Sequence, residues 1–276
     1  MIAPARVGRD GALRLGFERR GAATVLARCR STLPLQVLAP VALDDAAAVV
    51  ALLNPTGGVL GGDRLAIDVD IGPGAHACLT TPSATRIYRA AAEPAEQRVR
   101  LTLGPGAVAE WVPDHTIPSA GAALRQTLEI EAGDGAILVA IDAFAAGRVA
   151  RGEAWRFALL DSTLTVRDDR GLVLHDRFVL RGGEGWRGLG FAEGRPYFAT
   201  VVVLADTGLD DFVAGVPGVL AATEGATAAA ARLPRRGALV RCLAAGAPAL
   251  AGALDAVWGL ARRRLLGLRP LALRKL

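Results

Sequence analysis

The segment NPTGGVLGGD, from Asn54 to Asp63, is the densest cluster of residues that could do chemistry. Glycine-rich loops can bind phosphate through their backbone amides. The P-loop pattern fails here because Asp63 and Arg64 stand where Lys and Ser or Thr are required. The dinucleotide pattern fails because a strand, not a helix, is expected to follow. Two interpretations stay open: the glycines serve tight turns and close backbone approach, or they hold Asp63 toward a cavity or partner.

Histidine and cysteine side chains supply a second set of candidates. His76 and Cys78 stand two residues apart on an expected strand, so both lie on one face and form a possible soft metal pair. A half-buried strand explains the same spacing, because two ligands do not make a metal site. Asp114 and His115 are adjacent and would point to opposite strand faces, so they chelate poorly unless the chain turns there. His175 is expected to be exposed.

Hydrolase motifs are missing from the sequence. It contains no nucleophile elbow, no Ser–His–Asp set and no HExxH helix. Asp142 and Glu153 could act as a general acid and base if the fold brought them together. We therefore expect no catalytic residue and no enzyme. The alternative is a metal-dependent hydrolase that uses His76, Cys78 and His115.

The composition excludes several classes of protein. The chain has 276 residues, of which 52% are hydrophobic and 21% charged, so it is not intrinsically disordered. The net charge is +5, but aromatic residues make up only 5%, and the run Arg86–Arg89 lacks the aromatic-rich basic face of a nucleic-acid binder. Cys29, Cys78 and Cys242 are far apart and form no CxxC, which argues against a disulfide framework and fits a reducing compartment.

The chain shows no sign of membrane targeting. Its first residues, MIAPARVGRDGALRL, lack the apolar core of a signal peptide. The longest uncharged stretch, residues 46–62, contains a proline and four glycines and is shorter than the ~18 apolar residues of a spanning helix. We expect a soluble cytoplasmic protein.

The elements that must position these residues are mostly strands. Apolar and polar residues alternate, and a loose repeat recurs roughly every 30 residues. Each unit is a strand, a glycine-flanked turn and a second strand, as in LAIDVDI-GPGA-HACL from Leu65 to Leu79. Gly72, Gly104 and Gly133 are expected to supply positive φ in these turns. The pattern predicts a mainly β fold of stacked β-hairpins in a β-helix-like or sandwich arrangement.

The pattern changes towards the C-terminus. Strands continue to Val203, with a hairpin turn expected at Arg170-Gly171. Residues 209–223 and 248–266 have the apolar periodicity of helices. No long linker separates them from the strands. We therefore expect a single domain over 1–276, β-rich over about 12–205 and helical over about 206–268.

Several motifs occur in a characteristic order along the chain. They are PLQVLAP (34–40), NPTGGVLGGDRL (54–65), LTTPSATRIYRA (79–90), Gln97, GAVAEWVPDHTI (106–117), Gly147-Arg148 and Gly152-Glu153. In this order and spacing the chain resembles the UreD (UreH) urease accessory protein family over about residues 20–190. It departs from the family in Arg86, often a lysine, in WVPDH (111–115), usually WLPQE, and in the tail LRKL (273–276).

The resemblance implies a non-enzymatic scaffold and metallochaperone with a β-rich, helix-capped fold. Its expected partners are apo-urease subunits, a helical UreF-like accessory protein and a UreG-like GTPase, with no nucleic acid and no membrane. The expected role is to support GTP-dependent nickel insertion into urease. The partner would bind GTP, so no tightly bound cofactor is expected here, and Ni²⁺ would pass transiently.

A nickel path should offer exchangeable oxygen ligands, because a Cys/His cage would trap the ion. We expect the path among five carboxylates: Asp63, Glu110, Asp114, Asp142 and Glu153. Expected lining or structural residues are Gly61, Gly62, Thr80, Thr81, Ser83, Arg86, Tyr88, Arg89 and Gln97. The alternative is that Asp63 and Glu110 form internal ion pairs with Arg86 or Arg89.

Overall fold

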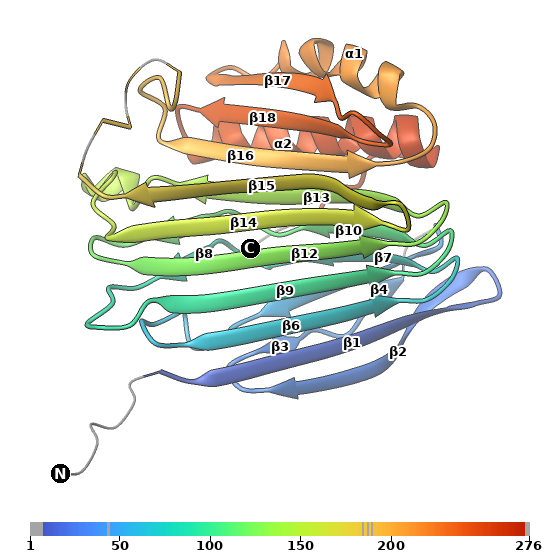
Figure 1. The fold of residues 1–276 in the computed structure, drawn as a ribbon, viewed down its shortest axis with the longest axis horizontal. Helices are drawn as coiled ribbons and strands as arrows, with labels where there is room; N and C mark the ends of the chain where they lie inside the picture. The colour runs from blue at the N-terminus through green and yellow to red at the C-terminus, as the bar shows by residue number, and fades with distance from the viewer. Residues whose placement is uncertain (1–7, 43–44, 184, 187, 189, 274–276) are drawn as a thin grey trace.

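The computed structural model describes residues 8–42, 45–183, 185–186, 188 and 190–273. Two β-sheets face each other, and two helices lie against the outer side of the second sheet (Figure 1). The sequence expectations for the first seven residues and for tail positions 274–276 lie outside the described part of the chain.

The described strands of the first sheet lie side by side in a spatial order that differs from the chain order. That order is β15 (Gly171–Arg181), β14 (Leu159–Asp168), β12 (Ala123–Ala132), β9 (Ala95–Leu103), β6 (Arg64–Ile71), β1 (Asp10–Arg20) and β2 (Ala23–Thr32).

The second sheet faces the first and is built from shorter strands. Its main path is β17 (Ala226–Arg232), β18 (Ala238–Ala244), β16 (Tyr197–Leu204), β13 (Ile137–Ala145), β10 (Val108–Val112), β7 (His76–Thr80), β5 (Ala47–Leu53) and β3 (Gln36–Val37). Three short strands attach to it: β4 (Val41–Ala42), β8 (Thr85–Ile87) and β11 (Thr116–Pro118).

The repeats form the coils of a parallel β-solenoid. Strands β6, β9 and β12 pair in parallel in the first sheet, and β7, β10 and β13 pair in parallel in the second. The mainly β, β-helix-like fold class is thus confirmed. The pairing inside each unit differs from a hairpin, because its two strands belong to opposite sheets. The expected hairpin at Arg170-Gly171 is present, because β14 and β15 pair antiparallel.

Glycines at the turns let the coils stack closely. The positive φ expected at Gly104 belongs instead to Gly106, at +62°. Gly104 is required for space, because a Cβ there would lie 2.8 Å from the backbone nitrogen of Pro73 in the preceding coil. Its amide donates to the carbonyl oxygen of Ile71 over 2.8 Å, so successive turns are hydrogen-bonded as well as packed.

The C-terminal part adds helices and further strands. Helices α1 (Leu209–Leu220) and α2 (Ala247–Ala261) confirm both helix predictions, and a π-helical turn over Arg262–Leu266 continues α2. The segment expected to be helical also contains β17 and β18, which extend the second sheet antiparallel to β16. No helix in the described part of the chain is long and apolar enough to span a membrane.

Two cores hold these layers together. Alternate residues of both sheets point inward and form the first core, which includes Leu101, Ile130 and Leu138. The second core lies between the second sheet and the helices, where Phe212 and Val257 are fully buried. Strands β7, β10, β13 and β16 of the second sheet are therefore covered on both faces, and alternate residues of each join the two cores in turn.

Candidate functional site

A cavity of about 320 Å³ lies between the two sheets. Apolar side chains such as Leu65, Val99 and Trp111 form much of its wall. The polar side chains that line it belong to loops at the ends of β5, β7 and β10 and to strand interiors: Asn54, Thr81, Ser83, Thr85, Arg86, Gln97, Asp114, Thr116, Gln126 and Asp142. Concave sites with an apolar wall and a few convergent polar groups are the usual form of a binding site.

A row of polar side chains crosses the inner face of the first sheet at the cavity. Gln97, Gln126 and Ser162 are in register on β9, β12 and β14. Asp142 on β13 of the second sheet accepts hydrogen bonds from both neighbours: Gln126 Nε2 donates to Oδ1 over 2.8 Å, and Ser162 Oγ donates to Oδ2 over 2.9 Å. Burial raises the pKa of Asp142 to about 6, and these two donors partly oppose that rise. Asp142 is thus a half-buried carboxylate that lines the cavity and can be ionised near neutral pH.

The loop after β10 forms one wall of the cavity opening. Thr81 Oγ1 accepts a hydrogen bond from the Asp114 amide over 2.8 Å. The chain turns at this point, so the amide of His115 and its ring Nδ1 both lie 2.8 Å from Oδ1 of Asp114. The adjacent pair therefore interacts, which a regular strand would prevent. Ser83 and Arg86 line the same cavity and are exposed.

The structure separates the five predicted carboxylates. Asp114 and Asp142 line the cavity, whereas Asp63, Glu110 and Glu153 do not. Asp63 is buried and accepts hydrogen bonds from the amides of Arg9 and Leu60.

Glu153 lies in a separate ion pair. Its carboxylate is 2.5 Å from Arg148 Nη2, and it also accepts from the amide of Ala120. The hydrogen bond from Arg148 lowers the pKa of Glu153. Asp142 instead bonds to Gln126 and Ser162. The two carboxylates therefore have different partners and do not form the predicted acid–base pair.

The predicted lining residues divide in the same way. Thr81, Ser83, Arg86 and Gln97 line the cavity. The other predicted residues do not line it: Gly61, Gly62, Thr80, Tyr88 and Arg89. Thr80 Oγ1 donates to the carbonyl of Val112, and the Tyr88 hydroxyl donates to the carbonyl of Gly57.

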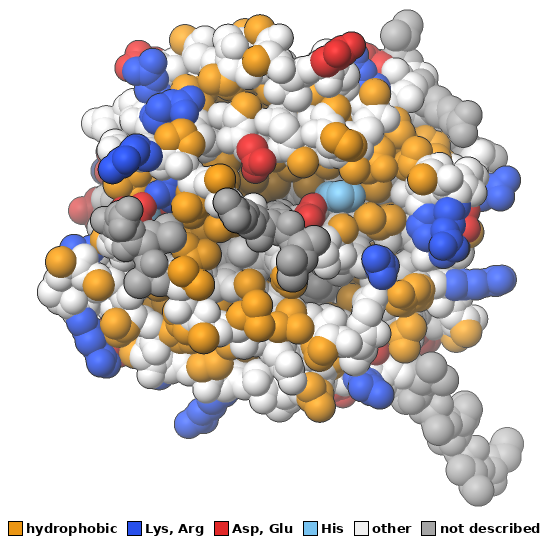
Figure 2. Space-filling view, turned by 180° about the vertical axis from the view of Figure 1, so that it is seen from behind, with side chains coloured by type: hydrophobic (Ala, Val, Ile, Leu, Met, Phe, Trp, Pro, Cys, Tyr) orange, Lys and Arg blue, Asp and Glu red, His pale blue; other side chains and the backbone are white. Residues whose placement is uncertain are grey.

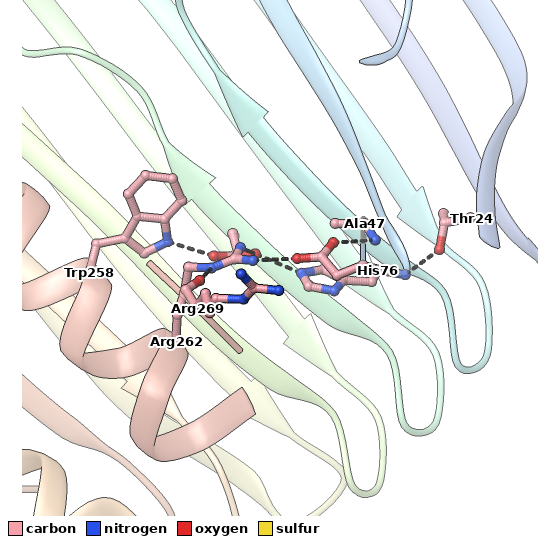
Figure 3. Close-up of polar contacts among 8 residues, drawn as sticks. Thr24, Ala47, His76, Trp258, Arg262 and Arg269 are labelled. Carbon is pink, nitrogen blue, oxygen red and sulfur yellow. Dashed lines mark hydrogen bonds and ion pairs between the residues drawn. The ribbon is translucent and has the colours of Figure 1, made fainter. Parts of the chain in front are cut away.

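Glu110 lies on the opposite face of the second sheet, where its carboxylate contacts Trp258 and Arg262. Figure 3 shows Trp258 and Arg262 reaching from the helical segment toward His76 on the sheet. Arg262 Nη1 donates to its Oε1 over 2.5 Å, and Trp258 Nε1 donates to its Oε2 over 2.5 Å. His76 Nε2 lies 2.6 Å from Oε1. Arg262 also donates to Asp45 Oδ2 over 2.5 Å. The internal ion pair predicted for Glu110 exists, but its partner is Arg262 and not Arg86 or Arg89.

The set proposed for a hydrolase is not assembled. His76 at the start of β7 bonds to Glu110 in the middle of β10, whereas His115 bonds to Asp114 beyond the end of β10. Across the described residues, no three His, Cys, Asp or Glu side chains are grouped so that they could hold a metal ion. Sequence reasoning missed Gln126, Ser162, Arg262 and Trp258, and the only available signal was a polar residue at an apolar position of an alternating strand, as at Gln126.

Comparison with known proteins identifies the family of this chain. The sequence model of the family described as UreD urease accessory protein matches residues 9–275. The chain belongs to the UreD family. The sequence-based resemblance to UreD is thereby confirmed, and it extends through the helical C-terminal part that the motifs did not cover.

Relatives within the UreD family cover most of this chain. A urease accessory protein UreD from Alkalilimnicola ehrlichii is 35% identical over 97% of the chain and 91% of its own length. The UreD of Deinococcus radiodurans is 37% identical over 97% of the chain and 95% of its own length. The UreD of Klebsiella aerogenes is 34% identical over 80% of each chain.

Proposed function

We propose that this chain is a non-catalytic accessory scaffold in urease maturation, which binds apo-urease and UreF-like and UreG-like partners. In this role it supports GTP-dependent nickel insertion, with GTP bound by the partner GTPase. Membership of the UreD family, whose relatives are urease accessory proteins, supports the role in urease maturation.

The proposal that nickel passes through this protein is based on the cavity between the two sheets. Its polar groups are carboxylates, amides, hydroxyls and the guanidinium of Arg86, and Asp142 accepts hydrogen bonds from Gln126 and Ser162 of the polar row. Oxygen ligands bind Ni²⁺ less tightly than a thiolate and imidazole cage, so the ion can exchange between successive groups. The negative charge on Asp142 compensates part of the charge on the ion.

A separate hollow lies on the outer face of the first sheet. It is more open and lies at the starts of β1, β6, β9 and β12, lined by charged residues such as Arg64, Glu96 and Arg125. Leu65 and Gln97 line both this hollow and the cavity. We therefore place the mouth of the nickel path at the loops around Asp114.

The molecule also offers an apolar surface for protein partners. Viewed from behind, hydrophobic side chains spread over much of the face (Figure 2). Around β3 and β4, Leu33 is 60% exposed, Leu38 51% and Val41 59%. Exposed apolar patches of this kind commonly mark protein interaction sites.

The test uses a urease-expressing host in which the gene for this chain is deleted. Complementation with the wild-type gene should restore urease activity, and failure to do so would contradict the maturation role. Asp142→Asn should restore less activity and lower the nickel content of purified urease. Glu129→Gln on the outer face of β12 is the matched control and should behave as wild type.

Two outcomes separate the proposals. If Asp142→Asn and Gln97→Leu both give fully nickel-loaded urease, the cavity is not the path, although the scaffold role stands. If these variants still co-purify with the accessory partners but yield nickel-poor urease, the defect lies in metal transfer and not in assembly.

A further inference from the structure

The turn that follows β10 is fixed by contacts from three other segments of the chain. The amide of Asp114 donates to Thr81 Oγ1 over 2.8 Å, just beyond the end of β7. The amide of Thr85 in β8 donates to the carbonyl oxygen of His115 over 3.1 Å. The ring of His115 lies edge-on to the ring of Tyr197 in β16, with 5.8 Å between the ring centres. The backbone of the turn and the imidazole are therefore held in place before any ligand arrives.

Within this turn, His115 points two donors at one oxygen of the Asp114 carboxylate. Its backbone amide and its ring Nδ1 each lie 2.8 Å from Oδ1 of Asp114. An ionised carboxylate only accepts hydrogen bonds, so the Nδ1 of His115 carries the proton in this contact. Hydrogen bonds to an ionised group are stronger than those between neutral groups. The pair of bonds thus restricts the rotation of the Asp114 side chain.

The two members of this pair have different surroundings. Asp114 is a lining residue of the cavity between the sheets, and His115 is not. The side chain of Asp114 is 26% exposed and that of His115 is 13% exposed. His115 therefore orients a carboxylate at the cavity without lining the cavity itself. Carboxylates that bind metal ions are commonly held in this way by an outer hydrogen-bond donor.

We propose that His115 is a positioning residue for Asp114, which offers Ni²⁺ a carboxylate at the mouth of the cavity. This inference rests on the proposed nickel path and adds the residue that prepares its entrance. His115 acts through its amide and its Nδ1–H, and it does not bind the ion. A single carboxylate assisted by water binds Ni²⁺ weakly, which suits an ion that must move on.

Titration calorimetry of the purified full chain with Ni²⁺ alone tests this role, with a chain that carries no polyhistidine tag. His115→Ala should raise the dissociation constant for Ni²⁺ about tenfold, as the loss of an outer hydrogen-bond partner does at metal sites. Asp114→Asn should weaken binding at least as much, because it removes the ligand. His175→Ala is the matched control, since His175 is exposed on β15, and it should leave the constant unchanged.

Two further variants separate positioning from direct metal binding. The side-chain nitrogen of asparagine can take the place of Nδ1, whereas that of glutamine can take the place of Nε2. His115→Asn should therefore stay within about twofold of the wild-type constant, because it still donates to Asp114. His115→Gln should bind Ni²⁺ as weakly as His115→Ala. Urea denaturation of the three variants checks that each is folded, and the comparison of Asn with Gln decides the matter even where alanine destabilises the turn.

Three results would overturn the role of His115. They are a His115→Ala variant that binds Ni²⁺ like the wild type, a glutamine variant that binds better than the asparagine variant, and equal losses in all three variants. Complementation of the deletion host separates this failure from that of the proposed function. If His115→Ala yields urease as rich in nickel as the wild-type gene does, His115 has no positioning role, although the chain still supports maturation. If the wild-type gene itself restores no urease activity, the maturation role fails as well.

Discussion

The guanidinium of Arg262 lies 2.5 Å from the carboxylate of Glu110, although 152 positions separate them in the sequence. Arg262 is 1% exposed and Glu110 is fully buried. The Nε of Arg262 donates to the carbonyl of Arg269 over 2.9 Å, and its Nη2 reaches Asp45. This one side chain thus links the end of α2, the segment that follows it, strand β10 and the loop before β5.

Removing one partner of this pair should be costly. Arg262→Met leaves the buried Glu110 carboxylate without its cation, and we expect a loss of about 3–5 kcal/mol in the free energy of unfolding. Urea denaturation measures it. Arg263→Met, at the exposed neighbouring position, is the control and should cost less than about 0.5 kcal/mol. Equal effects of the two variants would show that the buried pair adds nothing.

A double variant separates the pair from the packing around it. Glu110→Gln combined with Arg262→Met removes both charges together, so its cost should be smaller than the sum of the two single costs. Strict additivity in urea denaturation would contradict a direct interaction between the two side chains.

The stability of the protein should depend on pH through Asp142. Its pKa is raised from 3.8 to about 6 in the folded state, mainly by burial, so the folded chain holds the proton more tightly than the unfolded chain. The stability that this proton supplies is fully present below pH 4 and lost as pH rises through 6. Asp142→Asn removes this loss, so its stability relative to wild type should rise by about 3 kcal/mol between pH 3 and pH 8.

A second variant checks that the effect belongs to this carboxylate. Ser162→Ala keeps Asp142 but removes a hydrogen bond that lowers its pKa, so the transition should move to higher pH. Urea denaturation at a series of pH values measures both variants. A wild type and an Asp142→Asn variant with parallel stability curves would contradict the assignment.

The glycine-rich loop offers a matched pair of substitutions. Gly57 has φ of +83° with open space around its Cβ position, so Gly57→Ala should cost about 1–2 kcal/mol for the backbone conformation alone. Gly58 has φ of +154°, and a Cβ there would lie 2.7 Å from the carbonyl oxygen of Arg86. Gly58→Ala should therefore be the more destabilising in thermal or urea denaturation. The reverse order would show that close backbone approach is not why glycine is needed at 58.

The three thiols should react very differently. Cys29 is exposed, whereas Cys78 and Cys242 are buried. Burial also raises the pKa of Cys242 to about 12, so little thiolate forms there at pH 8. A chromogenic disulfide reagent should titrate a single thiol in the folded protein and all three in denaturant. Cys29→Ser should abolish the fast reaction. Any fast-reacting thiol that remains in this variant would contradict the burial of Cys78 and Cys242.

Local pattern was enough to identify the strands of the repeats, the hairpin at Arg170-Gly171 and both helices. Alternation marks each strand because the period of two follows from backbone geometry alone. The stacked repeat followed from glycine-flanked turns at regular spacing, and the order of the motifs identified the UreD family. Strand β17 was missed because an alanine-rich segment favours helix by propensity, and pairing with β18 overrides that preference.

Spatial relationships between distant segments required the tertiary structure. Alternation places Asp142 and Glu110 each on one side of a strand, but it cannot say what covers that side. The stacking of two sheets brings Asp142 to Gln126 and Ser162, and the packing of α2 brings Arg262 to Glu110. These long-range contacts decide whether a carboxylate lines a cavity or forms an ion pair. A buried charge needs a hydrogen-bond donor or a cation beside it, and only the fold determines which group that is.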